Sequence, residues 1–130
     1  MSVFVDTNIL VAAVTDDTDR SANAVRVLTE VEELHPSILN VMELRSVLTK
    51  KKGFERSRVE RIEDRVVRKT TVRFPDVSDI VAANHIQSEM LLYPMDALIV
   101  ATARSADCQL VSFDAELLNA GAVEPEKILS

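Results

Sequence analysis

Apolar residues are arranged in two ways along this chain. In some segments they recur at steps of three and four residues, as in amphipathic helices, and in others they form short runs, as in buried strands. Residues 21–34 carry apolar side chains at steps of three and four residues, which predicts a helix that Pro36 ends. We expect Ser78 or Asp79 to start another helix of this kind. The same repeat, interrupted at glycine or proline, predicts further helices over residues 40–50, 55–69, 79–92, 96–106 and 115–120.

Short runs of β-branched and aromatic residues separate these helices and predict strands. The runs are residues 2–5, 37–39, 72–74 and 109–113. Strands that alternate with helices predict an α/β fold of three layers, in which helices cover both faces of a mostly parallel central sheet. With 130 residues and neither an internal repeat nor a linker, the chain is expected to form a single domain over residues 1–130.

Composition excludes several kinds of function. The chain has only two glycines, Gly53 and Gly121, and therefore lacks the closely spaced glycines of nucleotide-binding loops. It has no tryptophan and 4% aromatic residues, which excludes base stacking as the main contact with nucleic acid. No apolar run approaches the roughly 20 residues that span a bilayer, and the first residues contain no signal peptide. We therefore expect a cytoplasmic protein without membrane contact.

Four acidic residues stand where a strand or turn leads into a helix: Asp6, Glu43, Asp96 and Asp114. In open α/β sheets, functional sites lie outside the carboxyl ends of the strands, so acids that are distant in sequence meet there. Helix capping is the ordinary explanation for each acid by itself, and Asn40 and Glu43 have the spacing of a capping box. Four such positions together favour a shared site.

A shared site of four carboxylates requires a cation, because two carboxylates roughly 4 Å apart repel by about 4 kcal/mol at an effective dielectric constant of about 20. The chain contains only two histidines, His35 and His85, and one cysteine, Cys108, so hard oxygen atoms are the available ligands. Such ligands select Mg²⁺ or Mn²⁺. A carboxylate-bound Mg²⁺ activates water and binds phosphate oxygens, which predicts hydrolysis of a phosphodiester bond.

The motifs that contain these acids resemble those of PIN-domain ribonucleases, and most closely those of the VapC toxins of type II toxin-antitoxin modules. They are VDTNIL at residues 5–10, the glutamate of NVMEL at Glu43, MDALIVATA at residues 95–103 and LVSFD at residues 110–114. The resemblance implies a Mg²⁺- or Mn²⁺-dependent endoribonuclease that acts on RNA, forms a homodimer and is inhibited by a cognate antitoxin protein. It also implies that the catalytic and metal-binding residues are Asp6, Glu43, Asp96 and Asp114.

Other polar residues of the same motifs have supporting roles by this resemblance. Asn8 and Ser112 match positions that assist the metal or the water in relatives. Phe113 is a departure, because relatives often carry a polar residue there, and it alters the hydrogen bonding expected around the ligands. Glu116 is either a fifth acid of the site or a solvated residue of a first helical turn, and we favour the second interpretation.

Basic residues are concentrated in one segment although the net charge of the chain is -6. Residues 50–73 contain ten basic and four acidic residues. Arginines recur there at helical steps of three and four residues and form a stripe along the predicted helix over residues 55–69. Our hypothesis is that Arg58, Arg61 and Arg65 guide RNA phosphates toward the acids. The alternative is a solvated helix face on which acidic neighbours pair with the arginines.

Two other functions stay open beside that of a toxin. The same chemistry serves an RNA-processing PIN nuclease that is not toxic. A non-enzymatic signalling or scaffold domain of the phosphoacceptor receiver type also groups acids at strand ends. That class requires an adjacent acidic pair after the first strand, whereas Thr7 and Asn8 follow Asp6 here. We therefore favour the nuclease.

Overall fold

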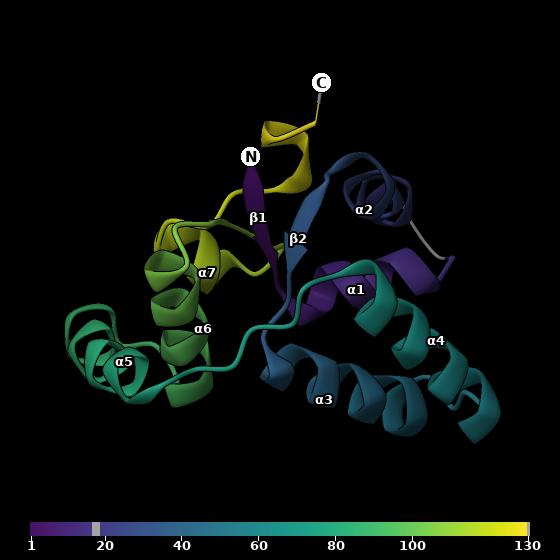
Figure 1. The fold of residues 1–130 in the computed structure, drawn as a ribbon, viewed down its shortest axis with the longest axis horizontal. Helices are drawn as coiled ribbons and strands as arrows, with labels where there is room; N and C mark the ends of the chain where they lie inside the picture. The colour runs from purple at the N-terminus through teal and green to yellow at the C-terminus, as the bar shows by residue number, and fades with distance from the viewer. Residues whose placement is uncertain (17–18, 130) are drawn as a thin grey trace.

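A parallel β-sheet lies at the centre of the computed structural model, which describes residues 1–16 and 19–129 (Figure 1). In sheet order, the strands of this described part are β2 (Glu33–His35), β1 (Ser2–Val5) and β3 (Gln109–Val111). Phe4 pairs with His35 on one side of β1, and Val5 pairs with Val111 on the other. The mostly parallel sheet expected from the sequence is confirmed, with β1 as its central strand.

Helices cover both faces of the sheet, which confirms the three-layer α/β arrangement. In chain order they are α1 (Thr7–Val14), α2 (Asp19–Glu30), α3 (Ile38–Ser46), the π-helical turn η1 (Val47–Lys51), α4 (Arg56–Lys69), α5 (Val77–Met90), α6 (Pro94–Ser105), α7 (Ala115–Asn119) and the short 3₁₀ helix η2 (Pro125–Lys127). Helices α1, α2 and α4 lie to the right of the strands in Figure 1, α3 runs below them, and α5 to α7 lie to the left. None of the helices in the described residues is both long and apolar enough to span a bilayer.

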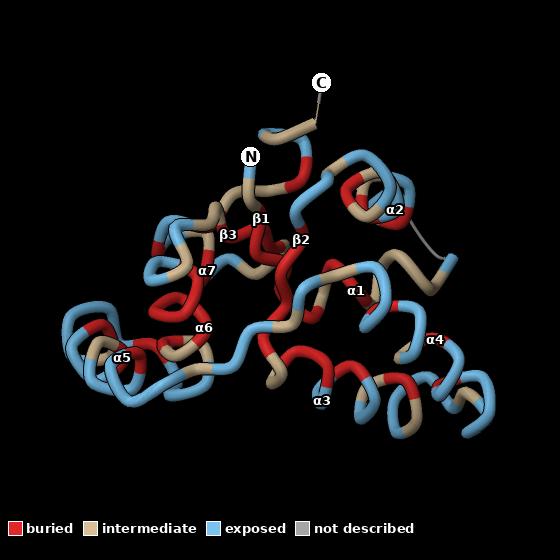
Figure 2. Tube along the Cα trace, in the orientation of Figure 1, coloured by how far each residue is buried: buried red, intermediate tan, exposed pale blue. Residues whose placement is uncertain are grey.

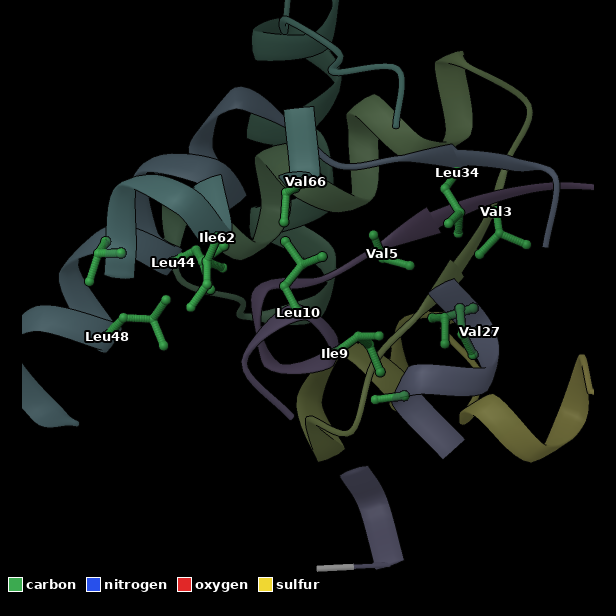
Figure 3. Close-up of a cluster of buried hydrophobic side chains, with 13 residues drawn as sticks. Val3, Val5, Ile9, Leu10, Val27, Leu34, Leu44, Leu48, Ile62 and Val66 are labelled. Carbon is green, nitrogen blue, oxygen red and sulfur yellow. The ribbon is translucent and has the colours of Figure 1, made fainter. Parts of the chain in front are cut away.

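The alternation of side chains along β1 builds a separate core on each face of the sheet. Val3 and Val5 point to one face and pack in a cluster with Leu10 of α1 and Leu44 of α3 (Figure 3). Phe4 points to the other face and packs against α5, α6 and α7. The strands are accordingly buried along most of their length, whereas α5 exposes a wide face (Figure 2). Because the strands are buried on both faces, their carboxyl ends form a rigid base for the polar residues attached to β1 and β3.

The helix predicted over residues 21–34 is too long. α2 ends at Glu30, and Leu34 lies in β2, where it is buried in the same core as Val3. Leu34 fits a helical step and a strand position equally well. Parallel pairing with β1 satisfies the backbone groups of residues 33–35, so the strand is formed instead of a further helical turn.

The strand predicted over residues 37–39 is wrong, because Ser37 caps a helix there. The Ser37 hydroxyl accepts a hydrogen bond from the Leu39 amide at 3.1 Å, and the Asn40 side chain accepts one from the Ser37 amide at 2.9 Å. This is a capping box, and α3 consequently begins at Ile38. The capping box suggested for Asn40 and Glu43 is therefore also wrong, since Glu43 lies within the helix.

Two smaller predictions around Pro75 need correction. Within the described residues, the strand predicted over residues 72–74 is reduced to one isolated bridge, between Ser37 and Arg73. The helix α5 is capped by Asp76, and not started by Ser78 or Asp79. Asp76 accepts a hydrogen bond from the Asp79 amide at 3.0 Å, and the Asp79 side chain accepts one from the Asp76 amide at 3.0 Å. The capping box thus begins the helix earlier than its apolar repeat does.

Candidate active site

Asp6 lies at the carboxyl end of the central strand, where β1 leads into α1. Its backbone is extended, and its side chain caps α1 by accepting a hydrogen bond from the Thr7 amide at 2.9 Å. Only 9% of Asp6 is exposed to solvent. Capping and a place in the site are therefore compatible, since the cap holds the carboxylate in one orientation.

Ser112, which follows β3, fixes Asp6, and Asn8 of α1 in turn holds Ser112. The buried Ser112 hydroxyl donates to Asp6 Oδ2 at 2.9 Å and accepts from Asn8 Nδ2 at 3.1 Å. Asn8 Oδ1 in turn accepts from the Phe113 amide at 3.2 Å. The supporting positions expected for Asn8 and Ser112 thus adjoin Asp6, and the backbone of Phe113 contributes a hydrogen bond although its side chain is apolar.

Asn40 fixes Asp6 from the side of α3, and sequence reasoning did not place it in the site. Its amide nitrogen donates to Thr7 Oγ1 at 2.9 Å and to Asp6 Oδ1 at 3.3 Å. Asn40 is 2% exposed and also accepts from the Ser37 amide, so every part of its amide group is engaged. The signal in the sequence was Ser37, whose capping box requires a polar residue three positions later.

Asp96 and Asp114 stand at the starts of helices on the other face of the sheet. Asp114 caps α7 and accepts from the Glu116 amide at 2.8 Å, and its own amide donates to Ser112 Oγ at 3.0 Å. Asp96 lies in the first turn of α6, after Pro94. The positive end of each helix dipole partly offsets the negative charge of the acid placed there.

Glu43 reaches the same place from the middle of α3. It is exposed, and its distance from the helix start excludes the capping role. Together the acids line one cleft of about 520 Å³, whose lining includes Asp6, Glu43, Asp96, Asp114 and Asn8. The structure therefore brings the four acids predicted from the sequence to a single cleft.

The acids of the cleft interact with one another through their charges. Burial raises the pKa of Asp6 above its ordinary value, against hydrogen bonds from Ser112 and Thr7 that lower it. Burial also raises the pKa of Asp96 to about 6. Negative neighbours add to this rise in the order Asp6, Asp114, Glu116 and Glu43. Charge repulsion in the cleft is thus a property of the folded chain.

The donor set fits a hard divalent cation that keeps part of its water. No group of three acidic, histidine or cysteine side chains in residues 1–16 and 19–129 lies close enough, as it stands, to ligate one ion together. Mg²⁺ does not need such a cage, because it retains several waters and binds through one or two carboxylates and substrate phosphates. The carboxylates of a wide cleft are suited to this mode of binding.

Other predicted residues lie outside the cleft. Glu116 is exposed in the first turn of α7 and is absent from the cleft lining, although its charge raises the pKa of Asp96. Arg58, Arg61 and Arg65 line a different cavity, of about 340 Å³, beside Ala13 at the end of α1. The structure therefore does not bring the arginine stripe to the acids.

Cationic residues of the cleft come from positions that sequence reasoning did not single out. Lys51 and Lys52, at the end of η1, and Arg20 of α2 line the cleft together with the acids. The Arg20 guanidinium also lies over the Phe113 ring, 4.9 Å from its centroid. The run of three lysines over residues 50–52 was the available signal for these cationic residues. Which of the lysines points in the direction of Glu43 depends on the π-helical turn.

Known proteins share the family signature and the fold of this chain. The family model for the PIN domain matches residues 3–123. A sequence search against curated proteins finds no match.

Similar solved chains occur in a toxin-antitoxin complex from Klebsiella pneumoniae, in the Sarcin-Ricin loop cleaving toxin VapC20 of Mycobacterium tuberculosis and in FitAcB from Neisseria gonorrhoeae. The TM-score is 0.78 in each case, at identities of 20%, 23% and 20%. The matches cover 95%, 95% and 98% of this chain, and 98%, 98% and 99% of the other. At these identities the likeness establishes the shared fold.

Proposed function

This chain belongs to the PIN domain family, and we propose that it is a Mg²⁺- or Mn²⁺-dependent endoribonuclease, a hydrolase of RNA phosphodiester bonds. Residues 1–130 would form a single PIN-like domain. The observation that supports it most directly is that four carboxylates from separate parts of the chain line one cleft, where burial and, after it, repulsion raise the pKa of Asp96. A bound cation offsets this repulsion, so cation binding in the cleft is favourable.

The residues of the cleft would have different roles in cation binding, because hydrogen bonds hold some of them more firmly than others. Asp6 is fixed by hydrogen bonds from Ser112, Asn40 and the Thr7 amide, so it would be the oriented ligand. Asp96, Glu43 and Asp114 would complete the acidic set around it. When bound, the cation supplies a water of lowered pKa and stabilises negative charge on the phosphate oxygens. Asn8 and Ser112 would act by keeping Asp6 and the end of β3 in register.

The test is cleavage of single-stranded and hairpin RNAs in EDTA, Mg²⁺ and Mn²⁺. Asp6→Asn and Asp96→Asn keep the shape of each side chain and remove its charge, so we expect the metal-dependent rate to fall by roughly a hundredfold or more. Glu89→Gln, at an exposed position of α5, removes one negative charge elsewhere and serves as the matched control. Cleavage by the Asp96→Asn protein at the wild-type rate, or cleavage by the wild type in EDTA, would contradict the proposal.

We further propose that the enzyme is the toxin of a toxin-antitoxin pair, acts on RNA in the cytoplasm and is restrained by a small antitoxin protein. The shared fold with a chain of the Klebsiella pneumoniae toxin-antitoxin complex and with VapC20 supports this role. Induced expression should arrest growth, and co-expression of the adjacent small open reading frame should relieve the arrest. RNA cleavage without growth arrest would instead favour the RNA-processing alternative.

A homodimer is part of the same proposal. Exposed apolar side chains on one side of α5 and in the segment after it support it, because an apolar patch of this kind marks an interaction surface. Val77, Ile80 and Val81 are 77%, 50% and 52% exposed, and Leu91 is 89% exposed. Sedimentation equilibrium should give a dimer for the wild type and a monomer for Ile80→Glu; a wild-type monomer would remove this part of the proposal.

The arginine stripe would act on RNA only at long range, through its charge. Charges outside a site raise the rate of encounter with a polyanion, and salt screens their effect. Replacing Arg58, Arg61 and Arg65 together by Gln should lower kcat/KM at low ionic strength and leave it unchanged at high ionic strength. A loss that persists at high salt would indicate direct contact, and no loss at low salt would exclude any role in RNA binding.

A further inference from the structure

The π-helical turn η1 changes which lysine points in the same direction as Glu43. In η1 the Lys52 amide donates to the Val47 carbonyl at 3.1 Å, a bond that spans five residues instead of the four of an α-helix. A π-helical turn advances by about 80° per residue, against about 100° in an α-helix. Residues that follow the turn are therefore rotated relative to Glu43.

This rotation distinguishes Lys51 from Lys50. If α3 continued as a regular α-helix, Lys50 would lie within about 20° of Glu43, and Lys51 would lie about 80° away. With the π-helical turn, Lys51 lies in about the same direction as Glu43, and Lys50 is turned away by about 80°. The cleft lies on the side of Glu43 that is opposite to Lys50, because its lining contains Glu43, Val47, Lys51 and Lys52 but not Lys50.

The charge of Lys51 is available for a ligand. In residues 1–16 and 19–129 no acid forms an ion pair with Lys51, which is exposed to solvent. Lys52 and Arg20 line the same cleft. The lining of the cleft thus contains both carboxylates, which would hold a cation, and ammonium and guanidinium groups, which attract phosphate.

We propose that Lys51, aimed by the π-helical turn, binds a backbone phosphate of the RNA strand in the acidic cleft and so positions the strand for cleavage. This inference rests on the proposed nuclease function. A phosphodiester matches both parts of the cleft, since its oxygens bind a carboxylate-held cation and a lysine at the same time. Lys51 is a positioning residue, because it holds the strand and leaves the reacting atoms to the acids.

The experiment compares Lys51→Gln with Lys50→Gln in the full chain, using a short single-stranded RNA oligonucleotide that the wild type cleaves. Both variants remove one positive charge from adjacent lysines, so they differ only in direction relative to the cleft. We expect Lys51→Gln to raise KM roughly fivefold with kcat nearly unchanged, and to reduce the salt slope of log(kcat/KM) by roughly 0.7. Lys50→Gln should behave as the wild type, and Lys51→Arg should restore KM.

A second measurement identifies the phosphate and separates the two proposals. Binding of oligonucleotides with one neutral methylphosphonate at each position is measured in EDTA with wild type and Lys51→Gln. We expect one position at which the neutral group weakens binding to the wild type but not to Lys51→Gln. If the protein cleaves RNA but Lys50→Gln and Lys51→Gln give the same KM, the role inferred for Lys51 is wrong and the nuclease proposal stands. The same conclusion follows if Lys51→Gln weakens only the binding of a protein partner. Absence of both cleavage and RNA binding in the wild type overturns it together with the proposed function.

Discussion

Replacing Asp96 by Asn is expected to stabilise the metal-free protein at neutral pH, because it removes a carboxylate whose charged form is unfavourable in the folded state. Burial, followed by the charges of neighbouring acids, raises the pKa of Asp96 from 3.8 to about 6. If fully effective, such a rise corresponds to about 3 kcal/mol of unfavourable free energy at neutral pH. Asp96 is only partly buried and water screens the charges around it, so we expect a gain of about 1 kcal/mol in the free energy of unfolding.

The gain should depend on pH with a definite sign. Between pH 3.8 and about 6 the unfolded chain has lost the Asp96 proton while the folded protein retains it. The wild type therefore loses stability as the pH rises through this window, since the folded state binds more protons than the unfolded state. The Asn variant lacks this titration, so the two proteins should have nearly equal stability below the window and differ fully above it.

Urea denaturation in EDTA, at about pH 4 and about pH 8, measures this difference. The matched control is Glu89→Gln, which removes one exposed negative charge away from the cleft. The reasoning is refuted if Asp96→Asn and Glu89→Gln have the same stability at the higher pH, or if the gain of Asp96→Asn persists at the lower pH. Added Mn²⁺ should stabilise the wild type more than Asp96→Asn, because only the wild type keeps the full acidic set.

Three further predictions concern the side chains that support the cleft. Ser112→Ala removes the hydroxyl that donates to Asp6 and accepts from the Asp114 amide, so unfolding measurements should show a loss of about 2 kcal/mol and titration a higher pKa for Asp6. Asn40→Asp should be less stable than Asn40→Ala at neutral pH, because it places a second carboxylate beside Asp6, and this order should weaken in acid. Leu48→Ala leaves a cavity at a fully buried position of η1 and should lower the free energy of unfolding by about 3 kcal/mol. A loss below about 1 kcal/mol would show that packing of Leu48 does not hold the π-helical turn in place.

Most of the fold follows from local signals that the tertiary structure leaves intact. The buried strand at residues 2–5 and the helices that begin near residues 56 and 94 agree with the pattern of apolar residues, because burial of one face is the same requirement in sequence and structure. The larger errors lie between Val31 and Leu39, where two patterns competed, and smaller ones lie around Pro75. Leu34 satisfies either a helical or a strand position, and pairing with β1 selected the strand.

The acids of the candidate site were predictable because each stands beside an element whose type was predictable. Asp6 and Asp114 follow strands of a parallel sheet, and such strands end at the same edge. Glu43 was grouped with them as an acid near an expected helix start, although it lies in the middle of α3 and has no capping role. Asn40 was assigned to that same cap, whereas in the folded chain its side chain joins α3 to Asp6.

The order of elements and the identity of the acids were thus determined by the sequence itself, through apolar periodicity and the chemistry of carboxylates. Tertiary structure alone decided which polar groups touch. It placed the arginine stripe beside the end of α1, away from the acids, and a single π-helical turn brought Lys51 into line with Glu43. The physical reason is that helix phase and packing depend on contacts between distant segments, and one additional residue in a turn rotates every later side chain of the helix.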